Sequence, residues 1–328
     1  MTHRVDVEGA ATVLARGGLV AFPTETVYGL GADAGQPMAV AKIFAVKGRP
    51  TSHPLIVHLA TTEGLAEWAR SIPPFAQRLI DVLMPGPITL ILPRAPHVSD
   101  GVTGGRDTVG LRVPAHPAAL AMIEALERLR GPSARPLHAG IAAPSANRFG
   151  SVSPTRAEHV HEDLSGEDVA VLDGGPCEVG LESTIVDCAN EAGPVILRVG
   201  GVARETIEDV LGVGVPLGTE GPSRAPGMMA AHYAPRARVI AAPEAMFADA
   251  VAHAVATGRR VASLGPATGL AVAIERLIPD DPREHARTLY ATLRALDAEG
   301  AETIVVALPP PRGLGLAIAD RLTRASRA

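Results

Sequence analysis

Short apolar runs alternate with amphipathic stretches along the first two thirds of the chain. Runs rich in Val, Ile, Leu and Ala predict buried or half-buried strands at residues 19–22, 55–59, 88–92, 109–113, 141–143, 169–172, 183–187 and 195–199. Apolar positions with helical spacing predict helices at residues 38–46, 63–71, 74–83 and 118–129. Because strands and helices are interleaved, we expect an α/β sheet with helices packed on it.

The pattern breaks at residues 213–236, which are rich in Gly and Pro and have the composition of a linker. A second alternation follows, with strands predicted at 238–241, 260–264 and 303–307 and helices at 244–256, 282–298 and 314–325. A chain of 328 residues is also longer than most single cores support. We therefore predict two domains, 1–212 and 237–328, of which the second is a small three-layer α/β unit.

Composition and charge exclude several classes of protein. A hydrophobic content of 47% with 20% charged residues is typical of a soluble globular protein, and the net charge of −5 disfavours a dedicated binder of nucleic acids or anionic membranes. Five Phe, three Tyr and one Trp leave few platforms for stacking bases. The two cysteines offer neither a disulfide framework nor a zinc quartet. Without a signal-peptide core or a membrane-length apolar run, we expect a cytoplasmic protein.

Lys47 is one of only two lysines among 30 basic residues, so it is a candidate for a role that Arg cannot fill. It precedes Arg49 by two positions, in a loop expected after an apolar helix. A compact ammonium and a planar guanidinium together suit a polyphosphate, although an isolated Lys-x-Arg is also typical of a solvated basic loop. On a loop, truncating either side chain is expected to cost no more than about 0.5 kcal/mol of stability.

Other polar groups stand where predicted strands end, which is where α/β proteins place binding residues. The segment Pro23-Thr-Glu-Thr-Val-Tyr-Gly-Leu-Gly31 supplies hydroxyls, an acid and two glycines that permit close backbone approach, or it is only a polar turn. Ser145 and Asn147 suit the oxygens of a phosphate or a sugar, or they belong to an ordinary turn. His58 lies in an apolar strand, where a satisfied core histidine is the plainer interpretation.

Arg112 also lies in a strand-like stretch. A buried guanidinium needs an anion, which is either a partner acid or a substrate carboxylate. The chain has no Walker-type phosphate loop, no Gly-x-Ser-x-Gly elbow and no metal-ligand spacing of histidines. Gly313-Leu-Gly315 lacks the third glycine of a dinucleotide site.

Taken together and in this order, the motifs resemble the YrdC-like threonylcarbamoyl-AMP synthase family in its longer two-domain form. They span about residues 10–212, and the segment Ala225–Met228, His232-Tyr233 and the trailing domain extend the resemblance to nearly the whole chain. The motifs are Phe22-Pro-Thr-Glu-Thr-Val-Tyr-Gly-Leu-Gly, Lys47-x-Arg49-Pro with Pro54-Leu-Ile-Val-His58, Pro85-Gly-Pro-x-Thr89, Val109-Gly-Leu-Arg112-Val-Pro, Pro144-Ser145-x-Asn147 and Leu172-Asp-Gly-Gly-Pro-Cys-x-Val-Gly-x-Glu182-Ser183-Thr184.

The resemblance implies a YrdC-like twisted sheet with a cleft and a smaller Rossmann-like C-terminal domain. It implies a nucleotidyltransferase that joins L-threonine, bicarbonate or CO2, and ATP into threonylcarbamoyl-AMP, with release of pyrophosphate. The product would pass to the tRNA threonylcarbamoyl transferase machinery, which modifies the adenosine next to the anticodon. Direct contact with tRNA is expected to be weak.

By similarity, Lys47 and Arg49 are the catalytic cations. The residues expected to bind ATP are Lys47, Arg49, His53, Thr108, Ser145, Asn147, Ser153, Arg198 and Tyr233. Those expected to bind L-threonine are Thr26, His58, Arg112, Ala143 and Ser183. Because a threonine carbamate is already an anionic nucleophile, the chemistry needs charge neutralisation more than a strong base. Mg²⁺ is expected to be held mainly by phosphates, with no protein side chains assigned to it.

His53 departs from the family, in which a small polar or basic residue usually stands before Pro-Leu. The stretch 126–138 is expected to be a surface excursion. The linker, residues 213–236, is expected to fold over the cleft as a lid, with Tyr233 near ATP. Two alternatives remain, a non-catalytic module that binds structured RNA and a carbamoyl-transfer step in hydrogenase maturation. The low number of aromatic residues disfavours the first, and the length and cysteine count disfavour the second.

Overall fold

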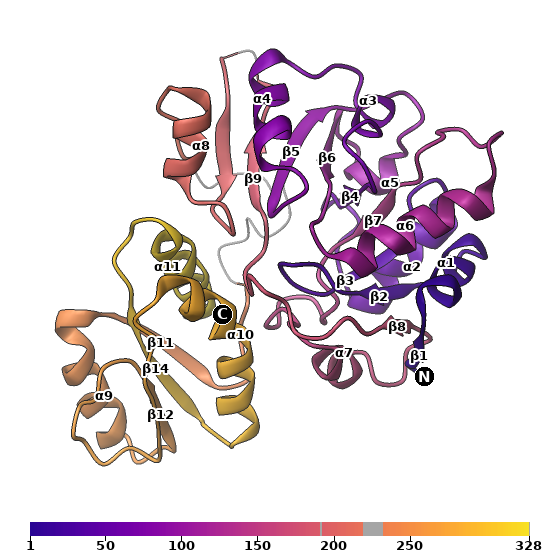
Figure 1. Ribbon diagram of the computed structural model, residues 1–328. Helices are drawn as coiled ribbons and strands as arrows, with labels where there is room; N and C mark the ends of the chain where they lie inside the picture. Colours follow the sequence, from indigo (N-terminus) through magenta and orange to yellow (C-terminus); the bar gives the residue numbers. More distant parts are fainter. Residues whose placement is uncertain (191, 219–231, 328) are drawn as a thin grey trace. The chain divides into compact units, whose positions relative to one another are not determined.

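The computed structural model describes residues 1–190, 192–218 and 232–327. Clustering of contacts divides the chain into two compact units, the first comprising Met1–Phe149 and Pro154–Met228, the second Gly150–Ser153 and Met229–Ala328. Figure 1 shows the elements of both units. Among the described residues, none of the helices combines the length and the apolar character needed to span a bilayer.

The first unit is built on one mixed ten-stranded sheet, ordered β1-β8-β2-β3-β7-β4-β6-β5-β9-β10. The sheet contains both parallel pairs, such as β4 with β6, and antiparallel pairs, such as β4 with β7. The strands are β1 (His3–Val5), β2 (Val20–Phe22), β3 (Gly29–Asp33), β4 (Ile56–His58), β5 (Ile88–Pro93), β6 (Thr108–Arg112), β7 (Ile141–Ala143), β8 (Ala170–Leu172), β9 (Thr184–Asp187) and β10 (Val195–Arg198).

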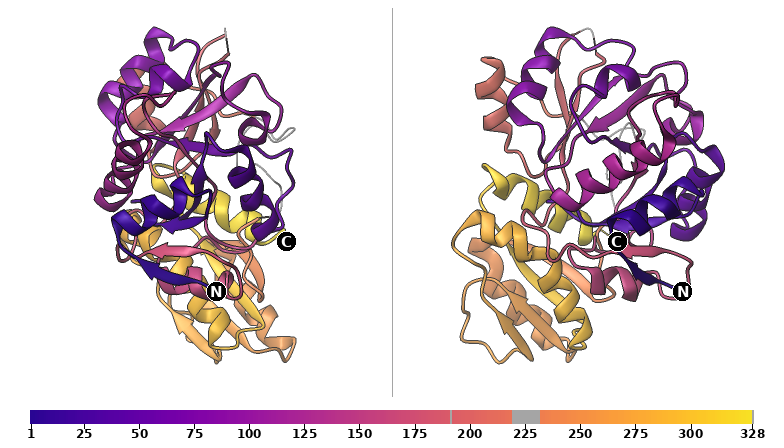
Figure 2. Two further views of the ribbon diagram at one scale, coloured as in Figure 1. Left: turned by 90° about the vertical axis from the view of Figure 1, so that its right-hand side faces the viewer. Right: turned by 45° about the vertical axis from the view of Figure 1, so that its right-hand side comes forward.

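Helices cover both faces of this sheet, so successive strand residues alternate between two cores. Phe22 and Ala143 join the core that contains α1 and α6, whereas Ala21 and Ala142 join the core that contains α2 and α4. Figure 2 shows the sheet from two further directions. The helices are α1 (Val7–Ala15), α2 (Pro37–Lys47), α3 (Leu65–Trp68), α4 (Pro74–Leu83), α5 (Asp100–Thr103), α6 (Pro117–Arg130), α7 (Ala157–Asp163) and α8 (Arg204–Leu211).

Most predicted elements of the first unit are confirmed to within about two residues, but two predictions are wrong. The helix predicted at 63–71 shrinks to α3, because Arg70 N donates to Pro93 O at 2.8 Å and draws the chain toward β5. The segment after Tyr28, predicted as a loop, forms β3. A Cβ at Gly31 would lie 2.6 Å from Ile141 Cγ2, so glycine permits close strand packing while hiding the apolar alternation.

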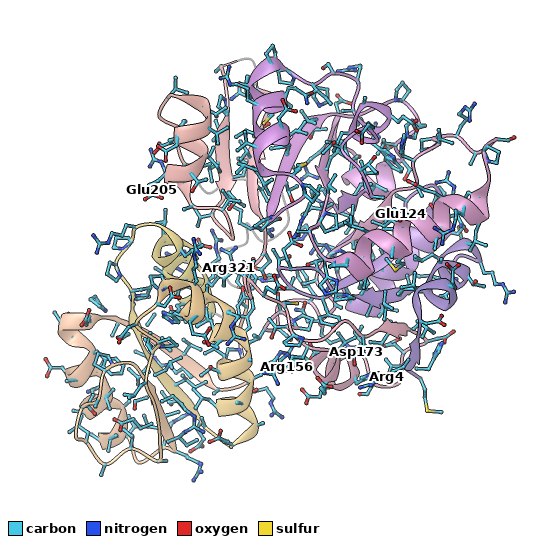
Figure 3. All side chains as sticks on the ribbon, viewed as in Figure 1. Arg4, Glu124, Arg156, Asp173, Glu205 and Arg321 are labelled. Carbon is cyan, nitrogen blue, oxygen red and sulfur yellow. The ribbon has the colours of Figure 1, made fainter. Side chains whose placement is uncertain are left out.

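The surface excursion predicted at 126–138 is found only in its second part. Residues 126–130 are the end of helix α6, with Leu126 buried, whereas residues 131–138 form no helix or strand and half of them are exposed. Strand β1 is an edge strand of the sheet, beside β8. Arg4 of β1 forms an ion pair with Asp173, the residue after β8, at 3.2 Å, and Figure 3 labels both side chains.

The second unit has the predicted three-layer α/β architecture. Its sheet runs β11-β14-β12-β13 with every pair parallel. Helix α9 contacts β11, β12 and β14, while α11 contacts β11 and β14 and also packs on α10; Figure 1 shows α9 on one side of the sheet and α10 and α11 on the other. The elements are β11 (Arg238–Pro243), a 3₁₀ turn (Glu244–Met246), α9 (Phe247–Ala256), β12 (Val261–Leu264), β13 (Ile274–Arg276), α10 (Pro282–Ala298), β14 (Thr303–Leu308) and α11 (Leu314–Ala325).

The predicted lid falls largely on residues 219–231, which lie outside the described residues, so it stays a prediction. Tyr233 is buried within the second unit. Its ring stacks on Tyr290 with centroids 5.9 Å apart, and the guanidinium carbon of Arg321, labelled in Figure 3, lies 5.0 Å from its centroid. The backbone of Tyr233 has φ 66°, an uncommon value for a non-glycine residue.

Candidate active site

Lys47 is the last residue of α2 and not a loop residue as predicted. The helix ends there because Gly48 adopts the left-handed conformation, with φ 64°, that closes many helices. The side chain of Lys47 is buried, and its Nζ donates to Ser145 O at 2.5 Å and to Asn147 O. The expectation that truncation costs little stability is therefore wrong, because Lys47→Ala would remove the donor from two carbonyls at a buried site.

The ammonium of Lys47 still has capacity for a ligand. An ammonium carries three N–H donors, and the two carbonyls use two of them. The pKa of Lys47 is held well below its ordinary value, mainly because burial removes the ammonium from water and further because Arg49 repels it. An anion placed here would offset both effects.

The loop after β7 wraps around Lys47. Ser145 Oγ donates to Asn147 Oδ1 at 2.5 Å, Asn147 Nδ2 donates to Arg148 O at 2.8 Å, and Phe149 N donates to Lys47 O at 3.0 Å. The structure thus brings together Lys47, Ser145 and Asn147, three residues expected to bind ATP.

Arg49 and His53 lie beside the same loop. Arg49 is buried, its Nη2 donates to Pro54 O at 3.1 Å, and its guanidinium carbon lies 5.8 Å from the centroid of the Phe149 ring. The His53 ring meets Phe149 edge-on at 5.6 Å between centroids. Partial burial lowers the pKa of His53, and the positive charges of Arg49 and Arg106 lower it further. A neutral imidazole therefore stands in this cationic loop.

The segment around Thr26 is fastened to the Ser145 loop by the backbone. Ala146 N donates to Tyr28 O and Leu30 N donates to Pro144 O, both at 2.8 Å. Thr26 is fully buried, with Oγ1 2.7 Å from Thr24 Oγ1. Two loops that are more than 100 residues apart in sequence therefore form one wall.

Arg112 has its anion within the protein, and this anion is Glu25. Arg112 Nη2 lies 2.8 Å from Glu25 Oε1, with the two side chains 4% and 6% exposed, and Arg112 Nε donates to Gly86 O at 3.2 Å. Apart from this ion pair, neither carboxylate oxygen of Glu25 has a hydrogen-bond partner among the described residues. Sequence reasoning omitted Glu25 from the site, although its place between two threonines at a strand end was a usable signal.

His58 lies beside Arg112 because β4 pairs with β6 in a register that sets His58 opposite Arg112. Its Nδ1 is 3.4 Å from Ile141 O on β7, the strand that also holds Ala143. Burial lowers the pKa of His58 to about 3, assisted by the charge of Arg112. The imidazole is therefore neutral near pH 7, as a core histidine would be.

Ser183 and Arg198, expected to bind different substrates, touch each other. Arg198 Nη2 donates to Ser183 O at 2.9 Å and to Ser183 Oγ at 3.1 Å, and Thr89 Oγ1 lies 2.8 Å from Ser183 Oγ. Thr89 belongs to one of the motifs but was not singled out as a ligand. If both assignments hold, the two substrates meet at Ser183.

Three other expected ATP ligands lie on other segments of the chain. Thr108 begins β6, at the end opposite Arg112, and lines a hollow of about 690 Å³ with Arg106 and Asp187. Ser153 and Tyr233 belong to the second unit. Within the described part of the chain there is no group of three or more His, Cys, Asp or Glu side chains arranged to hold a metal ion.

Comparison with known proteins identifies both domains. Residues 12–200 match the Sua5/YciO/YrdC family, described as telomere recombination, and residues 202–327 match the threonylcarbamoyl-AMP synthase C-terminal domain. The threonylcarbamoyl-AMP synthase of Pyrococcus abyssi is 42% identical over 97% of this chain and 93% of its own length. That of Bacillus subtilis is 39% identical over 99% of this chain and 94% of its own length.

A solved structure matches the whole chain. The crystal structure of P. abyssi Sua5 complexed with L-threonine has a TM-score of 0.89 at 38% identity and covers 100% of this chain and 97% of that one. The resemblance inferred from the motifs, and the two-domain α/β fold that it implied, are thereby confirmed.

Proposed function

The chain belongs to the Sua5/YciO/YrdC family, and we propose from this membership how its buried cations and hydroxyls make threonylcarbamoyl-AMP. The reaction joins L-threonine, bicarbonate or CO2, and ATP, and the product serves threonylcarbamoyladenosine synthesis in tRNA. We assign the enzyme to the nucleotidyltransferases, because an adenylyl group passes from ATP to a carbamate oxygen.

The observation that carries the proposal is the enclosure of Lys47 by the Ser145–Asn147 loop. The threonine ammonium first releases a proton. The neutral amine then attacks the carbon of CO2 and loses a second proton, or attacks the carbon of bicarbonate with release of water, and in either case a carbamate forms. A carbamate oxygen then attacks the α-phosphorus of ATP, and the bond from that phosphorus to the bridging oxygen breaks as pyrophosphate leaves. The third N–H of Lys47 and the guanidinium of Arg49 neutralise the charge that develops on the phosphates.

ATP is proposed to bind as its Mg²⁺ complex. The described residues supply no cluster of acidic or imidazole ligands, so phosphate oxygens and water would hold the ion, as is usual for magnesium at nucleotide sites. Of the remaining ATP ligands, Ser145 and Asn147 share the loop that holds Lys47, and Arg198 reaches the site through Ser183. Thr108, Ser153 and Tyr233 keep their proposed roles on the resemblance alone. His53 departs from the family pattern, and its proposed role rests on its contact with Phe149, the ring that Arg49 also faces.

The threonine end is proposed to use Arg112 for the carboxylate and Glu25 for the ammonium. The ammonium and carboxylate of zwitterionic threonine carry charges opposite to those of Glu25 and Arg112. Apart from the ion pair at Oε1, the Glu25 carboxylate has no hydrogen-bond partner among the described residues, so it can accept from an ammonium. Thr26 and Ser183 supply hydroxyls near the pair, while neutral His58 and small Ala143 shape the wall without adding charge.

We propose a catalytic domain at 1–212, a linker and lid at 213–236, and a C-terminal domain at 237–328. We also propose a cytoplasmic location, which suits the two cysteines, Cys177 and Cys188, because both are buried free thiols. Transfer of the product to the tRNA threonylcarbamoyl transferase machinery completes the proposed pathway.

ATP–pyrophosphate exchange tests the proposal. The purified chain is incubated with ATP and labelled pyrophosphate, and label should enter ATP only when L-threonine and bicarbonate are both present. Arg49→Ala should abolish the exchange, whereas Arg16→Ala, at an exposed position outside the site, should not change it. Exchange that is absent, or that proceeds without threonine, would contradict the proposed reaction, and a module that only binds RNA would show none.

A further inference from the structure

The second unit contains a cavity of about 480 Å³ that the proposed reaction does not use. The cavity lies at the carboxyl ends of the parallel strands, where Glu244 follows β11, Gly265 follows β12 and Pro309 follows β14. Its volume falls within the range of small-molecule sites. The chain therefore places a ligand-sized cavity where open parallel sheets bind ligands.

This edge of the sheet is also a topological switch point. Strands β11 and β14 are neighbours, with Pro243 paired to Leu308, yet the helices that follow them, α9 and α11, lie on opposite faces. Chains that leave adjacent strands toward opposite faces open a crevice between the strand ends, and nucleotides bind in such crevices in doubly wound folds.

A buried histidine supplies an independent sign of a ligand. His285, in the first turn of α10, lines the cavity and is only 4% exposed, yet its Nε2 has no hydrogen-bond partner among the described residues. Burial lowers the pKa of His285 to about 4, so the imidazole is neutral near pH 7 and Nε2 donates or accepts according to its tautomer. A buried polar nitrogen without a partner costs stability unless something binds it.

The two helix ends at the cavity differ in how they are capped. Helix α10 is capped by Asp281, which accepts from Arg283 N at 3.0 Å, whereas the N-cap of α11 is Gly313, which offers no side chain. Gly315 lets α11 start against the strand-end loop, because a Cβ there would meet Pro310 O at 2.2 Å. Exposed Arg312 stands beside this helix end, so positive charge gathers at the cavity wall after β14.

The carboxylates of the lining have distinct places. Glu244 stands at the end of β11, next to β14, which is the position from which an acid commonly binds ribose hydroxyls beside a phosphate-binding helix end. Asp280 also lines the cavity, in the segment between β13 and α10. The rest of the lining is mostly apolar, including Leu308 and Ile318.

We propose that this cavity binds a nucleoside monophosphate. The phosphate would meet Arg312 and the start of α11, the ribose hydroxyls would meet Glu244, and an edge of the base would bond His285 Nε2 within the apolar part. The proposal does not depend on the reaction proposed for the first unit.

The test uses the full-length chain and AMP as the probe. Photolabelling with 8-azido-AMP, followed by mass spectrometry of the peptides, separates this cavity from the ATP site of the first unit. Label is expected on peptides that contain His285 or Arg312, and excess AMP should remove it more effectively than inorganic phosphate or adenosine. Label confined to the first unit, or competition by inorganic phosphate as effective as that by AMP, would overturn the proposal.

Variants with matched controls complete the test. Arg312→Ala and Glu244→Gln should each weaken labelling of the second unit about tenfold, while Arg259→Ala and Glu275→Gln, at exposed positions outside the lining, should leave it unchanged. His285→Leu should abolish labelling and keep the unfolding temperature, since Nε2 has no protein partner to lose. Undiminished labelling in both Arg312→Ala and His285→Leu, or equal losses in the controls, would refute the assignment.

Discussion

The buried pair of Glu25 and Arg112 gives a quantitative test of threonine recognition. At 2.8 Å, two unit charges attract by about 6 kcal/mol in an effective dielectric of about 20, and desolvation of both groups offsets most of this. Removing one partner leaves the other buried and unneutralised, at a typical cost of about 3–5 kcal/mol. Glu25→Gln is nearly isosteric, so we expect the free protein to lose about 3 kcal/mol of unfolding free energy.

The effect of Glu25→Gln on threonine binding has two opposed parts. The substrate ammonium loses a charge-assisted hydrogen bond, worth about 1.5–3 kcal/mol, while the substrate carboxylate meets an Arg112 that no longer has a competing anion. Affinity for threonine alone therefore does not separate the two parts. A ligand that keeps the carboxylate and hydroxyl but has hydrogen in place of the ammonium does separate them, and 3-hydroxybutyrate is such a ligand.

The assay is isothermal titration of wild type and Glu25→Gln with L-threonine and with 3-hydroxybutyrate. The contribution of Arg112 is common to both ligands and cancels in the ratio of their dissociation constants. Wild type should prefer threonine, and Glu25→Gln should reduce this preference by about 10- to 150-fold. Glu178→Gln, at an exposed carboxylate on the loop that reaches Ser183, is the matched control. An unchanged preference in Glu25→Gln would refute the ammonium role.

Three further predictions concern Lys47, Arg112 and His58. Lys47→Ala should lose about 10²-fold or more in ATP–pyrophosphate exchange and about 1–3 kcal/mol in denaturant unfolding, and Lys47→Arg should restore neither; recovery in the arginine variant would contradict the role of a compact ammonium. Arg112→Lys should weaken threonine binding in calorimetry while ATP binding holds, and the opposite result would assign Arg112 to ATP. Because the pKa of His58 is about 3, below its ordinary 6.5, the folded state binds fewer protons than the unfolded state between these values, and stability is lost as pH falls through that window. Wild type should lose about 1.4 kcal/mol more than His58→Gln between about pH 7.5 and about pH 5.5, and parallel losses would show that His58 does not titrate in this way.

The sequence predicted long periodic elements better than short ones. Helices α4, α10 and α11 match their predicted bounds because each carries an uninterrupted apolar face. Strand β3 was missed because Gly29 and Gly31 show no hydrophobicity, although both lie against Phe22 in the core. The helix predicted at 63–71 was too long because α3 ends where Arg70 N donates to Pro93 O, a tertiary contact that no local pattern reports.

Which residues form the site was easier to predict than which of them contact one another. Motif order gave Lys47, Ser145 and Asn147 as neighbours, and the structure joins them through backbone carbonyls that any residue type would provide. The hydrogen bond from Ala146 N to Tyr28 O also joins backbone atoms, so it does not depend on side-chain identity and could not be predicted from the sequence. Glu25 was missed for another reason. The turn that holds Glu25 meets Arg112 through tertiary packing, which no local pattern reports. The position of an acid between two threonines at a strand end marked a candidate but did not identify its partner.

The retention of a lysine at position 47 in a chain of arginines follows from this geometry. Its ammonium is enclosed by two carbonyls that approach from one loop, and a compact group with three donors can bond both and keep one donor for a phosphate. A guanidinium is planar, has five donors and stays charged, so in the same buried place it would hold more donors than the loop can satisfy. Arg49 meets different demands nearby, since its fork spans the carbonyl of Pro54 and the face of Phe149. Because burial and Arg49 lower the pKa of Lys47, a bound phosphate would stabilise the protonated form of its amine. Binding of the phosphate and protonation of Lys47 therefore favour each other.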